Sequence, residues 1–304
     1  MSDLKLFNIS GNEVSQLEAK SVELEKSLQK LIEHNLETLI GVTFLASEHS
    51  TGPVHGGRID TLGVDENNCP IIVEYKRTSS ENVINQGLYY LDWLLDHKAE
   101  FQLLVMKALD AEKAETVDWQ GARVLCIAGD FTKYDQHAVQ QINRNIELIR
   151  YCKFGDQLLL LELINRVIVQ TEREPTTTVE TATSPSYKTI TDYFQKADQA
   201  LLDRYSALES FLLSLGDDVE QKTTNSYVAF RRLKNFACIE LRVSSNEILI
   251  FIKVNPDSIE LEDEFTRDVR SIGHFGTGDL EIRIKSAEDL EKAKPLLIKS
   301  YESS

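Results

Sequence analysis

Residues 56–76 constrain the fold most, because two strand patterns follow each other across one short turn. Arg58–Val64 alternates polar and apolar residues, as a half-buried strand does. Asp65–Asn68 is turn chemistry, and Ile71–Val73 is a β-branched run typical of a central strand. The pattern therefore predicts a β-hairpin inside a sheet.

Charged residues stand near the ends of these two strands: Asp60 in the first, and Glu74 and Lys76 in the second. Side chains alternate faces, so Glu74 and Lys76 share one face while Tyr75 takes the other. If the strands pair, Asp60 reaches the Glu74 side, where two carboxylates and a lysine can hold a divalent metal and a water beside a phosphate. A Glu-x-Lys pair on a strand is also common without any function. A site is favoured here because charge at the end of so apolar a strand is costly to bury.

These residues resemble the P-D-(D/E)-x-K nuclease superfamily, and most of all its branch of mismatch- and single-strand-cleaving endonucleases with RecB-like cores. Three stretches carry the resemblance: Gly57-Arg58-Ile59-Asp60, Val73-Glu74-Tyr75-Lys76-Arg77, and Gln86 with Tyr90 on a following helix. The resemblance implies an α/β fold, with an αβββαβ restriction-endonuclease-like core around a mixed sheet. It also implies hydrolysis of DNA phosphodiester bonds.

The resemblance implies a role for each residue of the pattern. Asp60, Glu74 and the Tyr75 carbonyl would ligate Mg²⁺ or Mn²⁺, and Lys76 would position the attacking water. Gln86 and Tyr90 lie four residues apart on one helical face and would orient the site. Arg58 and Arg77 would contact the substrate. Without a site, Gln86 would be a solvated helix residue and Tyr90 a core aromatic.

The family also carries an acid on the helix that precedes the sheet. The stretch from Glu25 to Leu36 resembles that helix, and Glu25 is the first choice for the acid, with Glu33 and Glu37 as competitors. Glu48, in a strand expected over residues 43–50, is a further candidate for a cleft position. Leucines and an isoleucine form an apolar stripe on this helix, so its acids fit a solvated face equally well.

A chain of 304 residues favours two domains. We expect a nuclease-like domain at 1–170, a flexible linker rich in Thr, Ser, Pro and Glu at 171–186, and an α+β domain at 187–304. The last of these resembles a small bacterial module of unknown activity found attached to nuclease-like domains. In the first domain, the pattern predicts a helix over 12–34 and a strand over 101–106. Gly273–Asp279 precedes a strand rather than a helix, so it predicts a structural turn and not a phosphate loop.

The chain has 33 basic and 49 acidic residues, for a net charge of −16, which opposes general binding to nucleic acid. We therefore expect DNA binding to be weak or narrow in specificity, with a protein partner or a homodimer as further possibilities. No apolar run is long enough for a membrane span, and no secretory signal is evident. The four cysteines are scattered, which indicates a cytoplasmic protein. The leading hypothesis is a Mg²⁺-dependent endonuclease; the alternative is a non-catalytic scaffold that acts through the C-terminal domain.

Overall fold

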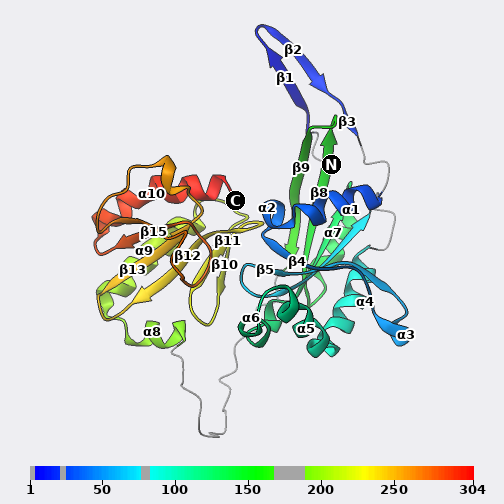
Figure 1. The fold of residues 1–304 in the computed structure, drawn as a ribbon. Coiled ribbons are helices and arrows are strands. Elements are labelled where there is room, and N and C mark those ends of the chain that lie inside the picture. Colours follow the sequence, from blue (N-terminus) through cyan, green and yellow to red (C-terminus); the bar gives the residue numbers. More distant parts are fainter. Residues whose placement is uncertain (1–3, 21–24, 77–82, 168–188) are drawn as a thin grey trace, which may run out of the picture. The chain divides into compact units, whose positions relative to one another are not determined.

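The computed structural model describes residues 4–20, 25–76, 83–167 and 189–304. The chain divides into two compact units, Met1–Glu174 and Pro175–Ser304, and each is built around a sheet of its own (Figure 1). Arg77 and the linker expected at 171–186 lie outside the described residues. The division into domains at those boundaries therefore stays a proposal.

The N-terminal unit contains two sheets and the helices that cover the larger one. Its strands are β1 (Leu6–Ser10), β2 (Glu13–Leu17), β3 (Ala19–Lys20), β4 (Val42–Ser50), β5 (Arg58–Asp65), β6 (Pro70–Lys76), β7 (Arg123–Ala128), β8 (Asn145–Phe154) and β9 (Leu158–Val167). Its α-helices are α1 (Glu25–His34), α2 (Leu36–Ile40), α3 (Gly52–His55), α4 (Val83–Asp96), α5 (Lys98–Ala108), α6 (Ala111–Glu115) and α7 (Lys133–Gln140).

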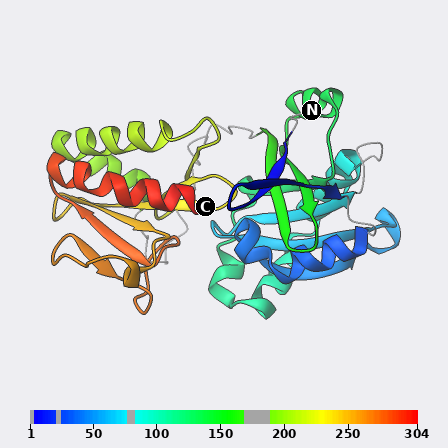
Figure 2. The ribbon, with the colours of Figure 1, turned by 90° about the horizontal axis from the view of Figure 1, so that it is seen from above.

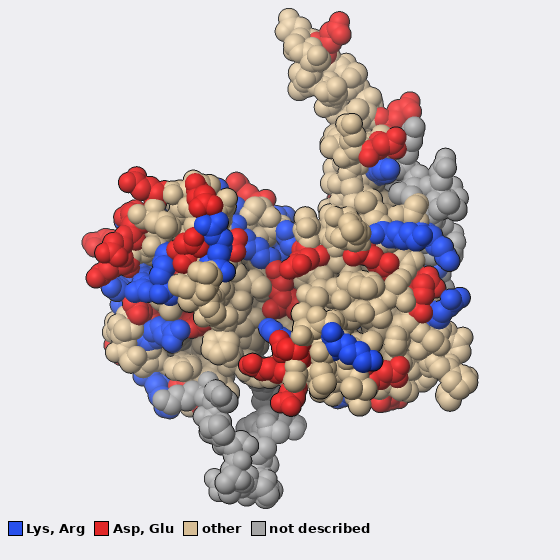
Figure 3. All heavy atoms as spheres, viewed as in Figure 1, with Lys and Arg blue, Asp and Glu red and all other residues tan. Residues whose placement is uncertain are grey.

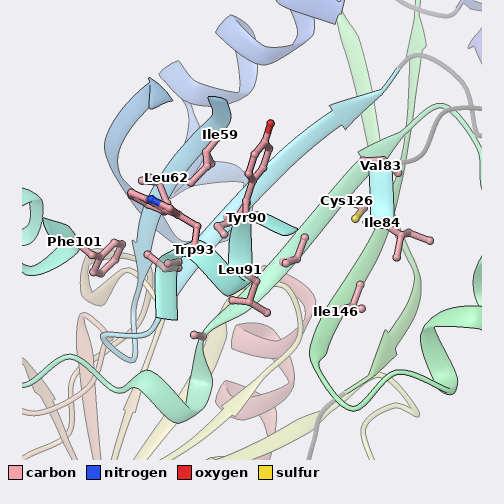
Figure 4. Close-up of a cluster of buried hydrophobic side chains, with 14 of the residues drawn as sticks. Ile59, Leu62, Val83, Ile84, Tyr90, Leu91, Trp93, Phe101, Cys126 and Ile146 are labelled. Carbon is pink, nitrogen blue, oxygen red and sulfur yellow. The ribbon is translucent and has the colours of Figure 1, made fainter. Parts of the chain in front are cut away.

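The larger sheet has the order β3-β8-β7-β6-β5-β4, with β9 paired to β8. Strands β6, β7 and β8 run parallel to one another and the other pairs are antiparallel, which confirms the mixed α/β sheet expected from the sequence. Apolar residues of α4, such as Trp93 and Leu94, pack with Ile72 and Val124 on one face (Figure 4). Helix α1 contacts Thr61, whose side chain takes the opposite face by strand alternation.

Two predicted elements of this unit are wrong. The helix expected over 12–34 begins at Glu25, and residues before it form the β1–β2 hairpin and β3. The turn of that hairpin contains Gly11 in the left-handed conformation, with φ of 62°, which is a hairpin signal that the helix prediction overlooked. The strand expected over 101–106 is helix α5 instead. A short apolar run fits either element, and here Phe101 and Val105 are buried at helical spacing.

The C-terminal unit is an antiparallel sheet with helices on one face. Its strands are β10 (Glu220–Thr223), β11 (Val228–Arg231), β12 (Asn235–Arg242), β13 (Glu247–Ile252), β14 (Thr266–Asp268) and β15 (Leu280–Ile284), in the order β10-β11-β12-β13-β15-β14. Figure 2 shows α9 (Gln199–Leu213) and α10 (Ala287–Glu302) on the same side of this sheet. With α8 (Ile190–Lys196), they bury the alternate residues Ile248, Ile250 and Ile252 of β13.

Candidate active site

The carboxylates of Asp60 and Glu74 are held together where β5 and β6 separate. The regular pairing of the two strands ends at Thr61 and Val73. Beyond that point, the Asp60 N–H donates to Oε1 of Glu74 at 3.2 Å, and the Tyr75 N–H donates to Oδ2 of Asp60 at 3.1 Å. Each carboxylate thus satisfies a backbone donor of the neighbouring strand. The two acids are therefore neighbours across the separating strands.

Glu74 is an unusual buried acid because it is fully shielded from solvent at 0 % exposure. Among the described residues, its second oxygen, Oε2, has no hydrogen-bond partner. Burial raises the pKa of Glu74 to about 9, and the nearby charge of Asp60 acts in the same direction. Lys76 opposes this shift only in part. At neutral pH the side chain is thus held as the neutral acid until a cation compensates its charge.

The two acids suit a hard divalent cation. Mg²⁺ takes oxygen ligands, keeps several waters, and binds through one or two carboxylates together with substrate phosphate. The Glu74 Oε2 atom, buried and without a partner in the described structure, is the kind of oxygen that such an ion would satisfy. Within the described ranges, no group of three or more His, Cys, Asp or Glu side chains is arranged to hold a metal.

The basic residues near the two acids differ in how far they are exposed and in their partners. Lys76 ends β6 and is half-buried, on the same face of the strand as Glu74 by alternation. Arg58 is 67 % exposed, and its guanidinium lies 3.6 Å from the carboxylate of Glu48. Glu48 has a left-handed φ of 50°, a conformation that is costly for a residue with a side chain. Arg58 is therefore partly neutralised before any phosphate reaches it.

Tyr90 and Gln86 lie on α4, close to the beginning of β5. The Arg58 N–H donates to the Tyr90 hydroxyl at 3.2 Å, and the Gln86 amide lies 3.5 Å from the same oxygen. Gly57 permits this approach, because a Cβ at that position would lie 2.7 Å from the tyrosine ring. Figure 4 shows Tyr90 among the apolar residues of α4. Tyr90 and Gln86 therefore hold the backbone of β5, the strand that carries Asp60. No described contact joins either residue to the two acids.

A polar network on the opposite face of the sheet supports the strand at Asp60. Gln29 of α1 is buried and donates to the Asp60 carbonyl at 2.9 Å and to Glu33 at 3.1 Å. The Thr61 hydroxyl donates to the same Glu33 carboxylate at 2.6 Å, and it lies 3.3 Å from the hydroxyl of buried Tyr75. Glu33 thus faces Thr61 and not the carboxylate pair. The side chain of Glu25, the first choice for the helix acid, lies outside the described structure.

Sequence reasoning missed Gln29, although a signal was present. It lies next to buried Leu28 and one turn before Glu33, so two polar residues adjoin the apolar stripe of the helix at spacing i and i+4. Glu37, the other competitor on this segment, is exposed in α2. Glu48 contacts Arg58. Among the described contacts, none joins Glu48 to Glu74.

The glycine loop of the C-terminal unit is packed as a turn. Gly276 has a φ of 77°, and a Cβ there would lie 2.5 Å from Cys238. His274 stacks on Phe251 with ring centroids 4.2 Å apart. Tyr227 and Arg231 of the same unit are also buried. The loop therefore covers the face of the sheet that the helices leave open.

Comparison with protein families gives a match for the C-terminal part. Residues 190–304 match the family described as a domain of unknown function (DUF5655). Nearly the whole chain is similar to an uncharacterised protein of Haemophilus influenzae, which is 28 % identical over 306 residues, covering 97 % of this chain and 98 % of that protein.

Two solved structures show a weak likeness. One is a repair endonuclease from Pyrococcus abyssi, with a TM-score of 0.30 and 19 % identity over 45 % of this chain and 50 % of that one. The other is EndoMS in a complex with dsDNA, with a TM-score of 0.29 and 20 % identity over 45 % of this chain and 51 % of that one. The likeness thus spans about half the length of each. TM-scores this low decide neither fold nor function.

None of the helices in the described part of the chain is both long enough and apolar enough to cross a membrane.

Proposed function

We propose that the N-terminal unit is a metal-dependent endonuclease with a PD-(D/E)xK, restriction-endonuclease-like core, and that it hydrolyses DNA phosphodiester bonds. The observation that carries the proposal is the Asp60–Glu74 pair at the separating strand ends, with the buried, unpartnered Oε2 of Glu74. A buried acid whose burial Lys76 offsets only in part is destabilising, so its presence calls for a ligand.

Asp60, Glu74 and the Tyr75 carbonyl would hold Mg²⁺ or Mn²⁺. Such an ion, when bound, neutralises phosphate charge and lowers the pKa of its water. Glu74 must give up its proton to act as a ligand, so its burial makes ion binding dependent on pH.

Lys76 would orient the attacking water and stabilise charge that develops on the phosphoryl group. Tyr90 and Gln86 would act through the strand, because Tyr90 binds the backbone at Arg58, two residues before Asp60. Arg58 and Arg77 would contact substrate phosphates, and Arg58 would first have to leave Glu48.

The test is cleavage by the purified full chain of labelled single-stranded, duplex, mismatched and branched DNA, in Mg²⁺, in Mn²⁺ and in EDTA. We expect metal-dependent cleavage of at least one substrate. D60N and E74Q should each lose at least about 100-fold in rate, as removal of a group that stabilises the transition state does. D96N, an exposed acid at the end of α4, is the matched control and should cleave normally. Undiminished cleavage by D60N would overturn the proposal.

The second candidate is a nuclease fold retained as a scaffold that acts through the C-terminal unit. The net charge of −16 and the pairing of Arg58 with Glu48 favour it, because both weaken phosphate binding. The two candidates differ in how E74Q binds DNA in Ca²⁺. An enzyme with few phosphate contacts predicts a slope of about −2 to −4 for log affinity against log salt. The scaffold predicts no binding at physiological salt.

A further inference from the structure

The β1–β2 hairpin, called the arm here, is an amphipathic ribbon that no other described strand covers. All of its strand residues except Leu6 and Leu17 are exposed. Ile9 pairs with Val14 across the ribbon, and the two are 72 % and 63 % exposed. Phe7 lies on the same face, two residues before Ile9, and is also exposed. One face of the arm is therefore apolar and open to water.

The opposite face of the arm is polar near its tip. Asn8 pairs with Ser15, and Ser10 pairs with Glu13. A two-stranded hairpin alone in water is marginally stable at best, and it needs a further strand or a packed apolar face. The arm thus has the pattern of an element that packs against another surface, and the face with Phe7, Ile9 and Val14 is the contact side.

The same chain has a second strand, β9, whose outer edge no described strand covers. Strand β9 pairs with β8 and with no other described strand. It reads Leu-Leu-Leu-Leu-Glu-Leu-Ile from Leu158, and its positions are half-buried or exposed on both faces. A long apolar edge strand is a template for pairing with another chain unless it is blocked. The single acid in this run, Glu162, is paired with Arg150 of β8 and so does little to block the edge.

Position and charge make the arm and β9 suited to each other. Ala19 of β3, two residues after the arm, pairs with Phe154 of β8, and the other neighbour of Phe154 is Leu158 at the start of β9. From Leu4 to Leu17 the arm has one base, Lys5, and one acid, Glu13. Figure 3 shows the arm mostly as uncharged atoms. On a chain of net charge −16, these neutral surfaces are where two copies can meet with little repulsion.

We propose that two copies of this chain form a dimer in which the apolar face of each arm covers strand β9 of the other. Because one chain carries both the arm and its receiving strand, a two-fold axis makes the contact twice and closes the assembly. The arm has no cluster of basic residues, so it is not suited to nucleic acid. This dimer does not depend on the proposed nuclease activity.

The first test is sedimentation of the full chain over a range of micromolar concentrations. We expect a dimer that dissociates on dilution. I9E/V14E places two charges on the apolar face, where both positions are exposed, so folding is spared. It should weaken association by about 100-fold or more, because burial of an unpaired charge is costly. N8E/S15E adds the same charges to the polar face and should dimerise like the wild type. A monomeric wild type, or a dimer indifferent to I9E/V14E, would overturn the proposal.

The second test asks whether the arm meets β9. L159K and L160K alter successive residues of β9, which face opposite sides, so one of the two should dissociate the dimer. Mixing that variant with I9E/V14E should restore association: one contact then joins Glu to Lys, and the other is native. Failure of the mixture to associate, although each variant alone is folded by circular dichroism, would overturn the assignment of β9 as the receiving strand.

Discussion

Carboxylates lie at both ends of the β5–β6 hairpin, but their partners differ between the two ends. At the turn end, Oδ2 of Asp65 lies 2.5 Å from Nη1 of the Arg123 guanidinium and forms an ion pair with it. Glu147 of β8 lies 3.2 Å from both Arg123 and Arg166. Burial alone would lower the pKa of Arg123, but the two acids raise it above its usual value. The buried charges at this end compensate one another within the protein.

At the other end, the hairpin opens beyond Thr61 and Val73. The acids bind backbone N–H groups, and one oxygen of Glu74 lacks a partner there. Acids paired with a buried arginine suit a structural network, whereas a buried carboxyl oxygen without a partner in the described structure can accept a ligand. This difference favours the open end as the proposed site.

Removal of a charge from the compensated end should have the largest effect. R123M keeps most of the side-chain volume but leaves Asp65 buried without its cation. We expect the free energy of unfolding to fall by about 3–5 kcal/mol, as when one partner of a buried ion pair is lost. Urea denaturation followed by tryptophan fluorescence measures this, since both tryptophans, Trp93 and Trp119, belong to the N-terminal unit. A loss below about 1 kcal/mol would mean that the two ends do not differ.

The matching change at the open end should leave the fold unharmed. D60N preserves an oxygen that can accept from the Tyr75 N–H, and it removes one of two neighbouring acids. In EDTA, we expect the free energy of unfolding of D60N to equal that of the wild type or to exceed it by up to about 1 kcal/mol. A clear destabilisation of D60N in the same denaturation assay would assign this pair to the structure of the protein.

Support for Asp60 from the far face of the sheet can be tested separately. Q29M removes the donor to the Asp60 carbonyl while filling the same space. We expect metal affinity to fall by about 10–100-fold, as for other residues that orient a ligand without touching the metal. K30M changes the exposed neighbouring residue of α1 and serves as the control. Mn²⁺ titration of both variants decides the matter, and equal affinities would leave Gln29 with a packing role only.

The burial of Glu74 should also make the stability of the protein depend on pH. The pKa of Glu74 is raised from 4.5 to about 9, so between these values the folded state binds more protons than the unfolded state. Stability from this group is therefore lost as pH rises through that window, by at most about 1.4 kcal/mol per pH unit. E74Q has no such proton, so in EDTA its stability relative to the wild type should increase from pH 5 to pH 9. A constant difference would show that Glu74 is ionised throughout.

The smallest expected effect concerns the strained neighbour of the open end. E48G places glycine where φ is 50°, which relieves the strain of a side chain in the left-handed region. We expect a gain of about 0.5–1 kcal/mol, reduced by the loss of the weak pair with Arg58. E48A loses the same pair without relief of strain and should be the less stable of the two. The order of their melting temperatures checks the prediction.

Part of this comparison could be predicted from the sequence. The alternation in Arg58–Val64 and the β-branched run before Glu74 predict the hairpin, and its register brings Asp60 to Glu74. The separation of the strands could not be predicted, because it depends on carboxylates replacing ladder bonds. Nor could the role of Gln29, which depends on how α1 lies across the sheet. Local periodicity determines strands, whereas polar contacts between distant elements arise only in the assembled fold.

The central claim is that Asp60 and Glu74 form one cation site. Titration of the full chain with Mn²⁺ in a calorimeter, in buffers from pH 6 to pH 9, tests it most directly. The account predicts one site per chain whose affinity rises with pH as Glu74 loses its proton, and which is lost in both D60N and E74Q but kept in D96N. Mn²⁺ binding that survives in D60N and E74Q, or a wild type that binds no Mn²⁺ at any of these pH values, would contradict it.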